Sequence, residues 1–381
     1  MVVGSSRHGA GVWRLVVVVS AALSVVARSL SGWCCAVLVG VVHLGGCASP
    51  AQGPLHPSLP AQCTHTITRA EDVSMVLALV APGDTVCFVG PDLAQAVVTM
   101  ARSGTARAPI RLVAQELVTV REVQIRADYV SVEGFDVAGG AGVSLEGTGL
   151  TVKNNTVHDT QQDGISCHPC MDSTIESNVL RHNTTNGVDL TGERITVRAN
   201  TISGTVPQDN GDTDGMRFYG NDLQITDNTI VDLSMAGYAS PPHPDCFQTL
   251  DAGKPPTFNV LIANNICRNV DAQCLIATGD QDANSGAPPA VPSIIFRENS
   301  CANNGAQAVD LRRWPNVQIV HNTFSGSNLR RAVLITEGST GTTVTGNTTT
   351  GDCPTVEIDD SSRPGSHIND RVIDNSRTAR R

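Results

Sequence analysis

The chain has 381 residues, with 26 Lys and Arg against 36 Asp and Glu, a formal net charge of −10, and only 3% aromatic residues. A surface of this charge repels nucleic acid and anionic lipid headgroups, so we expect neither as a direct partner. The length is sufficient for a large buried core.

Residues 1–47 are predicted to be a targeting segment rather than part of the fold. They contain no Asp or Glu, and apolar runs at 15–26 and 36–42 follow arginines. The sequence LGGC at 44–47 resembles a bacterial lipobox, which predicts lipid attachment at Cys47 and a cell-surface lipoprotein. Ordinary secretion with cleavage nearby is the alternative. In either case the mature protein is extracellular, and a lipid at Cys47 is its only expected membrane contact.

A cap is expected to precede the repeats. Residues 48–62 are rich in proline and are predicted to form a flexible linker. Residues 71–112 begin with EDVSMVLALVAPGDTVCFVG, which suggests a short helix followed by a strand. A repeat domain needs such a polar-ended cap to close its core. Cys63 and Cys87 flank this helix and are expected to form a disulfide.

A recurring phrase, apolar-x-apolar-x-x-Asn, dominates the rest of the chain. The gaps between successive asparagines are 23, 22, 28, 37, 34, 23 and 25 residues. Repeats of 20 to 25 residues with occasional longer gaps indicate a solenoid with insertions. We expect the asparagine side chains to stack at a tight turn as a ladder of amides, with left-handed backbone there. The asparagines are Asn155, Asn178, Asn200, Asn228, Asn265, Asn299, Asn322 and Asn347.

A short strand follows most of these asparagines after nine residues, and its second and fourth positions are apolar with one exception. Alternation with a period of two places both positions inside. One strand in the phrase and one after it give at least two strands per coil, and stacked coils form a parallel β-helix. We therefore predict an all-β fold of about ten coils with an N-terminal helical cap, at residues 63–362, followed by a polar tail at 363–381.

Export permits disulfides, and nine cysteines follow Cys47. Cys246 and Cys274 share a strand position on adjacent coils, and Cys267 and Cys301 each lie two residues after an asparagine. Coils about 4.8 Å apart would bring each pair within disulfide range. An unoxidised stack of buried cysteines is the alternative. The Cys-x-x-Cys at Cys167 and Cys170 is predicted to form a local disulfide rather than a metal site.

The third and fifth positions of each short strand point outward, and the middle coils place unusual side chains there. Long insertions precede or follow the same strands, at 204–214, 237–245, 251–257 and 279–292. Repeat proteins place such insertions around a binding face, so these loops are predicted to wall a groove. The side chains expected in or beside this groove are Asp189, Arg217, Tyr219, Gln248, His168, His243 and Lys254.

A row of polar residues precedes the strands, and it contains Asp214 and Asp245 on neighbouring coils. With Asp212 these carboxylates are candidate Ca²⁺ ligands. The stretch from Asn210 to Asn221 lacks the glutamate that ends an EF-hand loop, so that motif is excluded. Acidic turn caps without a metal are the alternative interpretation.

The repeats at about residues 110–350 resemble the right-handed parallel β-helix proteins of the pectate-lyase-like superfamily. The cap phrase APGDTVCFVG and the following SGTARAPIRLVA are similar to the N-terminal phrase of alginate- and chondroitin-type lyases. VHDTQQDGISC, DGMRFYG and HPDCFQT are similar to phrases of secreted actinobacterial β-helix proteins. The resemblance implies a right-handed coil and a polysaccharide ligand, but this fold hosts several activities.

Three functions fit this sequence, and we expect a monomer in each. The first is a lyase or C5-epimerase of a uronic-acid polysaccharide, with Arg217, Tyr219, His243 and Asp245 as catalytic residues. There, Asp189, Gln248, His168 and Lys254 would bind substrate, and Ca²⁺ is a possible cofactor. The second is a glycoside hydrolase that uses paired aspartates. The third is a non-catalytic module that binds carbohydrate at the cell surface.

Overall fold

The computed structural model describes residues 62–208, 211–280, 284, 286–350, 353 and 355–372. The predicted targeting segment, the lipidation site at Cys47 and nearly all of the linker lie outside the described residues. The described residues belong to one compact unit, Ser58–Arg381. Among them, no helix has both the length and the apolar composition needed to span a membrane.

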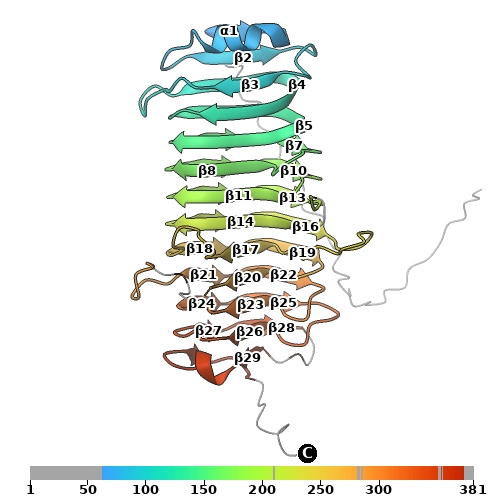
Figure 1. The fold of residues 1–381 in the computed structure, drawn as a ribbon, viewed down its shortest axis with the longest axis vertical. Coiled ribbons are helices and arrows are strands. Elements are labelled where there is room, and N and C mark those ends of the chain that lie inside the picture. The colour runs from blue at the N-terminus through green and yellow to red at the C-terminus, as the bar shows by residue number, and fades with distance from the viewer. Residues whose placement is uncertain are drawn as a thin grey trace, which may run out of the picture. The chain divides into compact units, whose positions relative to one another are not determined.

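The strands of this unit stack as a right-handed parallel β-helix of about 12 turns, which confirms the predicted fold and slightly exceeds the expected coil number. Figure 1 shows the coils piled on one another from the cap helix to the C-terminal turn. Only about 4% of the chain is helical. Each coil contributes three strands, which agrees with the expected minimum of two, so the β-helix has three faces.

The cap contains the predicted short helix followed by a strand, and a short strand that the sequence did not predict precedes the helix. The long strand β5 (Val130–Thr148) then follows the turns of the coil and pairs in succession with β6 (Thr151–Lys153), β7 (Thr156–His158) and β8 (Ile165–Met171). It therefore contributes to all three faces. The first elements are β1 (His65–Ile67), a 3-10 turn (Ala70–Asp72), α1 (Val73–Leu77), β2 (Thr85–Val89), β3 (Val97–Met100), β4 (Ile110–Arg126) and β5 (Val130–Thr148).

Face 1 is made by the short strands in which apolar residues occupy alternate positions. Val188, Met216 and Phe247 pair in register across β11, β14 and β17, and all three side chains are buried. The predicted inner column is therefore confirmed. The strands are β8 (Ile165–Met171), β11 (Asn186–Glu193), β14 (Asp214–Asn221), β17 (Phe247–Leu250), β20 (Leu275–Thr278), β23 (Val309–Arg312), β26 (Val333–Thr336) and β29 (Val356–Ile358).

Face 2 is made by the strands that precede each asparagine. Its last strand, β30, pairs with β27 through His367 and Ile368, so the parallel pairing continues past residue 363. The strands are β6 (Thr151–Lys153), β9 (Thr174–Glu176), β12 (Thr196–Arg198), β15 (Gln224–Thr226), β18 (Val260–Ala263), β21 (Ile294–Arg297), β24 (Val317–Val320), β27 (Thr343–Thr345) and β30 (His367–Ile368).

Face 3 is made by the strands that follow each asparagine, and a short 3-10 turn (Asp360–Ser362) lies between β29 and β30. The strands of face 3 are β7 (Thr156–His158), β10 (Val179–Arg181), β13 (Thr201–Ser203), β16 (Thr229–Leu233), β19 (Ile266–Val270), β22 (Ser300–Asn303), β25 (Thr323–Ser325) and β28 (Thr348–Thr349).

The asparagines form the predicted ladder at the turn between faces 2 and 3. The Nδ2 of Asn178 donates to Oδ1 of Asn200 at 3.0 Å and to the carbonyl oxygen of Val152 at 3.0 Å. The backbone amide of Asn178 donates to the same Oδ1 at 2.9 Å. The pattern repeats through all eight asparagines and ends where Asn347 donates to Asp370. Each side chain thus satisfies buried polar groups of its own coil and of the next.

The left-handed residue of this turn is the one before each asparagine, which corrects the expectation that the asparagine itself adopts this backbone. Asn154, Ser177 and Ala199 have φ of 57°, 57° and 55°. Left-handed backbone costs about 1–2 kcal/mol for residues other than glycine. The ladder hydrogen bonds hold the turn in this conformation.

The disulfides are partly those predicted. Cys63 pairs with Cys87, and Cys167 pairs with Cys170, as expected. The predicted pairing along the coil stack was wrong for the other four cysteines. Cys246 pairs with Cys267 and Cys274 with Cys301, at Cα–Cα distances of 6.3 and 6.1 Å. Each of these bonds crosses the interior of the coil from the start of face 1 to face 3, because both side chains of a pair point into the core.

Candidate functional site

The middle coils of face 1 bring three predicted site residues together. Asp189 of β11 pairs in register with Arg217 of β14, and Arg217 pairs with Gln248 of β17. Parallel strands in a sheet lie about 4.8 Å apart, so the three side chains are neighbours on the outer surface. The repeat alignment predicted that these three residues lie side by side, and the strand register agrees.

Arg217 is held by two carboxylates, one from the loop before β14 and one from the first residue of β14. Its Nε donates to Oδ2 of Asp214 at 2.6 Å, and its Nη2 donates to Oδ2 of Asp212 at 3.1 Å. The arginine side chain is mostly buried, and Asp214 is completely buried. Burial lowers the pKa of Arg217, but the paired carboxylates outweigh this effect and raise it. The guanidinium is therefore a fixed charge that organises the loop.

His243 and Asp245 form a second charged pair beside Arg217. Nδ1 of His243 lies 2.9 Å from Oδ2 of Asp245, and the backbone amide of His243 donates to Oδ1 of Asp212 at 2.8 Å. Asp212 therefore joins the histidine loop to Arg217. The hydrogen bond with Asp245 raises the pKa of His243 to about 9, and half of the imidazole is exposed.

Asp214 and Asp245 also continue a ladder between coils. Oδ1 of Asp214 accepts the backbone amide of Asp245 at 2.9 Å, and Oδ1 of Asp245 accepts the amide of Gln273 at 2.6 Å. Both side chains are 0% exposed. The oxygens proposed for Ca²⁺ are thus used by amides, Arg217 and His243. This arrangement matches the acidic-cap interpretation better than a calcium site.

Tyr219 was expected to be exposed in the groove, and this expectation was wrong. Its side chain points away from the coil interior but is only 2% exposed. Nζ of Lys254 lies 4.5 Å from the centre of the ring, a cation–π contact. Burial raises the pKa of Tyr219 to about 12. The loop at 251–257 therefore contacts the tyrosine through Lys254.

The insertions rise at both ends of the middle strands, as predicted. Before the strands, His243 and Asp212 tie two loops together. After them, the backbone amide of Asn284 donates to Oδ2 of Asp251 at 2.6 Å, and its Oδ1 accepts the amide of Thr257 at 2.7 Å. Asn284 is buried, and these hydrogen bonds join it to the loop at 251–257.

A second polar cluster lies one coil nearer the cap. The register between β8 and β11 shifts between Leu190 and Gly192, so two residues of β8, His168 and Pro169, lie opposite Thr191. Such a bulge redirects a side chain. Nε2 of His168 lies 3.4 Å from Oδ2 of Asp189.

Asp163 completes this cluster from the turn before β8. Its Oδ1 accepts Nδ2 of Asn186 at 2.8 Å. Burial is the main cause of its pKa of about 6, and the nearby carboxylate of Asp189 adds to it. The pKa of His168 is raised, first because it is hydrogen-bonded to Asp189. The sequence did not single out Asp163 or Asn186, because each belongs to the row of polar residues that precedes the short strands.

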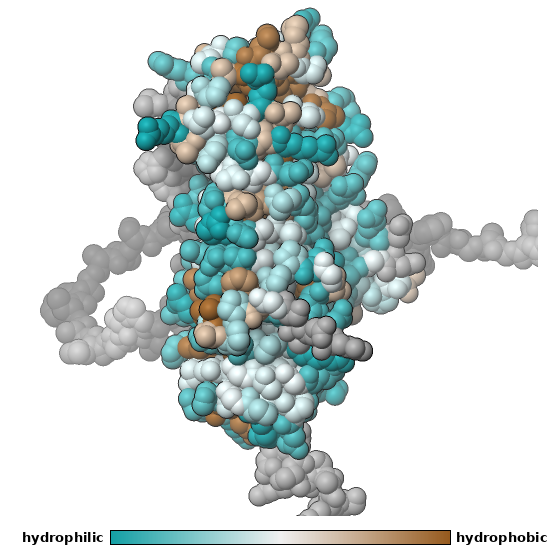
Figure 2. Space-filling model, turned by 60° about the vertical axis from the view of Figure 1, so that its left-hand side comes forward, coloured by the Kyte–Doolittle hydropathy of each residue, from teal (hydrophilic) through white to brown (hydrophobic). Residues whose placement is uncertain are grey.

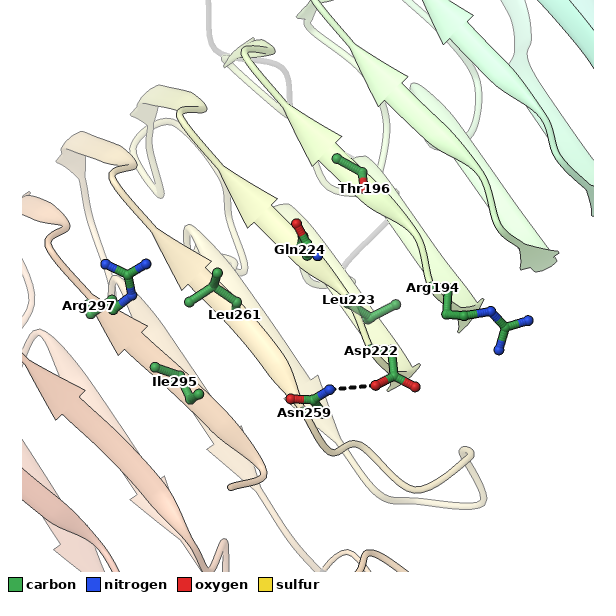
Figure 3. A pocket seen from close by; sticks show the side chains of 9 residues that line it. All are labelled: Arg194, Thr196, Asp222, Leu223, Gln224, Asn259, Leu261, Ile295 and Arg297. Carbon is green, nitrogen blue, oxygen red and sulfur yellow. Dashed lines mark hydrogen bonds between the residues drawn. The ribbon is translucent and has the colours of Figure 1, made fainter. Parts of the chain in front are cut away.

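A cleft that the sequence did not predict lies on face 2. It has a volume of about 660 Å³ and crosses four coils. Its floor includes Gln224 and the apolar Leu261 and Ile295, and Figure 3 shows Arg194 and Arg297 on opposite sides of this floor. Asn259 donates to Asp222 at its rim. The sequence signal for this cleft was the presence of Leu261 and Ile295 at strand positions that point outward.

Figure 2 shows mostly hydrophilic side chains along the column, with hydrophobic groups gathered near the cap and in a smaller area lower down. The cap end carries Met75 and Leu79, both well exposed.

Comparisons with known proteins agree with this fold. Residues 141–285 match the model of the family described as right handed beta helix region. No sequence among curated proteins matches the chain.

Similar solved structures share the fold at low sequence identity. A tailspike protein of an E. coli bacteriophage, in complex with a pentasaccharide, is 12% identical with a TM-score of 0.52, covering 82% of this chain and 59% of that chain. An alginate lyase from Paenibacillus is 13% identical with a TM-score of 0.49, covering 82% and 100%. The A-module of a mannuronan C-5 epimerase from Azotobacter vinelandii is 13% identical with a TM-score of 0.46, covering 80% and 90%. At this identity the likeness is one of fold. The chain is a right-handed parallel β-helix protein.

Proposed function

We propose that the chain is an extracellular enzyme that acts on a uronic-acid polysaccharide, as a lyase or a C5-epimerase. Both reactions begin with removal of the proton at C5 of the sugar. That proton is weakly acidic, so an enzyme must neutralise the adjacent carboxylate and position a base. The observation that carries the proposal is the half-exposed His243, which the buried Asp245 holds next to the carboxylates of Asp212 and Asp214.

His243 is the proposed base. Asp245 binds Nδ1 of the ring, so the neutral imidazole keeps its hydrogen on Nδ1 and its lone pair on the other nitrogen, Nε2. A buried aspartate plays the same orienting part in catalytic triads. A pKa of about 9 makes His243 a strong base, but it is charged at neutral pH. Activity should therefore rise with pH and level off above about 9.

Lys254 is the proposed partner of the substrate carboxylate. Its ammonium lies over the ring of Tyr219. Lys254 belongs to the loop that follows β17, whereas His243 belongs to the loop that precedes β17. Arg217 is committed to Asp212 and Asp214, so its role is to hold the loop in place. Gln248, whose Nε2 lies 3.5 Å from Oδ2 of Asp212, is placed to bind a hydroxyl group.

Proton abstraction can be tested without knowing the final product. The protein would be incubated in D₂O at pH 9 with alginate, pectate or a glycosaminoglycan. New absorbance from a 4,5-unsaturated uronate, whose C5 carries no hydrogen, indicates a lyase, and deuterium at C5 without this absorbance indicates an epimerase. His243→Ala should lower the rate at least about 100-fold, the lower range for a general base.

His182→Ala is the matched control, because His182 is an exposed histidine paired with a carboxylate outside the site. The proposal is wrong if every substrate keeps its C5 hydrogen, or if His243→Ala and His182→Ala are equally active. Reducing ends formed without the absorbance of an unsaturated uronate would indicate hydrolysis. The structure weakens that alternative, because its aspartates, Asp214 and Asp245, are buried and bonded to backbone amides.

A non-catalytic carbohydrate-binding function is favoured by one observation, the cleft on face 2. Its mixed lining of Gln224, Leu261 and two arginines suits a sugar chain better than a reaction centre. If this is the function, Leu261→Asp should weaken binding to the same polysaccharide panel, and His243→Ala should leave binding unchanged. The reverse pattern would assign the polysaccharide to face 1.

A further inference from the structure

Three side chains near the cap side of the site converge on one point. Asp163, His168 and Asp189 each place one ligand atom so that the three atoms lie within 4.8 Å of one another. They come from two coils, with Asp163 in the turn before β8, His168 in the bulge of β8 and Asp189 on β11. A bulge is required to turn His168 toward Asp189, so the cluster does not follow from the regular repeat.

The cluster has free ligand capacity in the part of the chain that the structure describes. Oδ1 of Asp189 is buried and has no hydrogen-bond partner. Oδ1 of Asn186 is also buried without a partner, although Nδ2 of the same amide donates to Asp163. A buried oxygen without a partner is costly in a folded protein unless a cation, ion or water binds it.

The ligand side chains are also oriented by neighbours, as in metal sites. Nδ1 of His168 lies 3.2 Å from Oγ1 of Thr191, which leaves Nε2 directed at Asp189. Asn186 holds the carboxylate of Asp163 at 2.8 Å. Second contacts of this kind fix the ring tautomer and the direction of metal ligands.

The donor atoms indicate which cation fits. Calcium prefers six to eight oxygen ligands, whereas an imidazole nitrogen suits zinc and other transition metals. Zinc bonds of about 2.0–2.2 Å in a tetrahedral arrangement place neighbouring ligands about 3.4 Å apart. The measured separation between His168 Nε2 and Asp189 Oδ2 is 3.4 Å. The imidazole is partly exposed, so a fourth position is open to water.

We propose that Asp163, His168 and Asp189 form a binding site for a divalent transition-metal cation of the Zn²⁺ type. The site differs from the calcium site suggested by sequence, which involves Asp212, Asp214 and Asp245. It does not depend on the proposed lyase or epimerase activity. A simple ion pair between His168 and Asp189 is the competing explanation of the geometry.

The test measures binding and not turnover, so it can fail or succeed separately from the proposed function. The full chain would be treated with EDTA, dialysed and titrated calorimetrically with ZnCl₂, MnCl₂ and CaCl₂. We expect one Zn²⁺ per chain at this site and tighter binding of Zn²⁺ than of Ca²⁺. The visible spectrum of added Co²⁺ would report tetrahedral coordination.

Two variants remove ligands with little change in size, His168→Gln and Asp189→Asn. Each should weaken Zn²⁺ binding at least tenfold and abolish the tetrahedral Co²⁺ spectrum. The matched control is His158→Gln. His158 also lies between two aspartates, Asp136 and Asp159, but they bind opposite ring nitrogens and cannot chelate one ion. Circular dichroism would show that each variant is folded.

Unchanged Zn²⁺ affinity in both folded ligand variants would overturn the proposal. So would equal losses in His158→Gln and His168→Gln, or the absence of Zn²⁺ binding to the wild-type chain. If one ligand variant fails to fold, the other still decides between a metal site and an ion pair.

Discussion

Nδ1 of His243 and Oδ2 of Asp245 lie 2.9 Å apart, and the other oxygen of this buried carboxylate accepts the backbone amide of Gln273. One carboxylate thus fixes both an exposed imidazole and the start of the next coil. The imidazole is thus attached to the frame of the β-helix and not only to its loop. Changes at Asp245 should therefore affect the chemistry of the histidine and the stability of the fold together.

Asp245→Asn should lower the pKa of His243 from about 9 toward the ordinary value of 6.5, because the negative partner is lost. An NMR titration of the imidazole protons would measure this shift. The midpoint of the proposed alkaline pH profile should move down by the same amount. A His243 pKa near 9 in the variant would mean that Asp212 and Asp214, and not Asp245, set its value.

The stability of the protein should depend on pH through His243. Its pKa is raised in the folded state, to about 9 from 6.5, so the folded state binds the proton more tightly. The contribution is fully present below about pH 6.5 and is lost as the pH rises through about 9. Urea unfolding of the wild type and of His243→Gln should show a difference in free energy at pH 6 that shrinks by pH 10. A difference that grows with pH would contradict this.

The asparagine ladder should be most sensitive in its centre. Asn228 is completely buried, and it accepts from Asn200 and donates to Asn265 and to the carbonyl of Val197. Asn228→Ala leaves several of these groups without partners and should cost about 2–4 kcal/mol, since each buried orphan costs about 1–3 kcal/mol.

Asn347→Ala is the matched control for the ladder, because this asparagine lies at the exposed end and donates to Asp370. Its cost should be about 1 kcal/mol or less, because water can replace a lost partner at a part-exposed site. Denaturant unfolding would measure both variants. Equal costs would show that the ladder contributes by turn geometry alone.

The disulfide pairing can be read directly by mass spectrometry. Proteolysis without reduction should yield linked peptides that join Cys246 to Cys267 and Cys274 to Cys301. Peptides that join Cys246 to Cys274 would instead favour pairing along the coil stack. The variant Cys267→Ser should then leave Cys246 reactive toward a thiol reagent after unfolding, with Cys274 still protected.

Much of the candidate site follows from the repeat itself. The asparagine spacing aligns the coils. This alignment by itself predicts that Asp189, Arg217 and Gln248 lie side by side. The register of β11, β14 and β17 confirms that alignment. In a stack of parallel strands, the position of a residue in the repeat determines which residues lie beside it. The register is fixed because a shift of one residue would turn the inner apolar column outward.

The predictions that were wrong concern side chains whose contacts are not set by the repeat. Tyr219 occupies an outward position, but it is buried in contact with the loop of Lys254, and loop conformation is not periodic. The predicted disulfide pairing was wrong for a related reason. Adjacent positions in the stack lie close together, yet side chains that cross one coil meet equally well in its interior, and sequence spacing does not distinguish the two.

The sequence alone therefore determined the architecture, the inner columns, the asparagine ladder and the coils whose insertions surround the site. Each of these depends on hydrogen bonds and burial that recur with the repeat. Only the tertiary structure decided which carboxylates are consumed by backbone amides, which cysteines meet, and how a bulge turns His168 toward Asp163 and Asp189. Those outcomes depend on local departures from the repeat, and packing across neighbouring coils selects them.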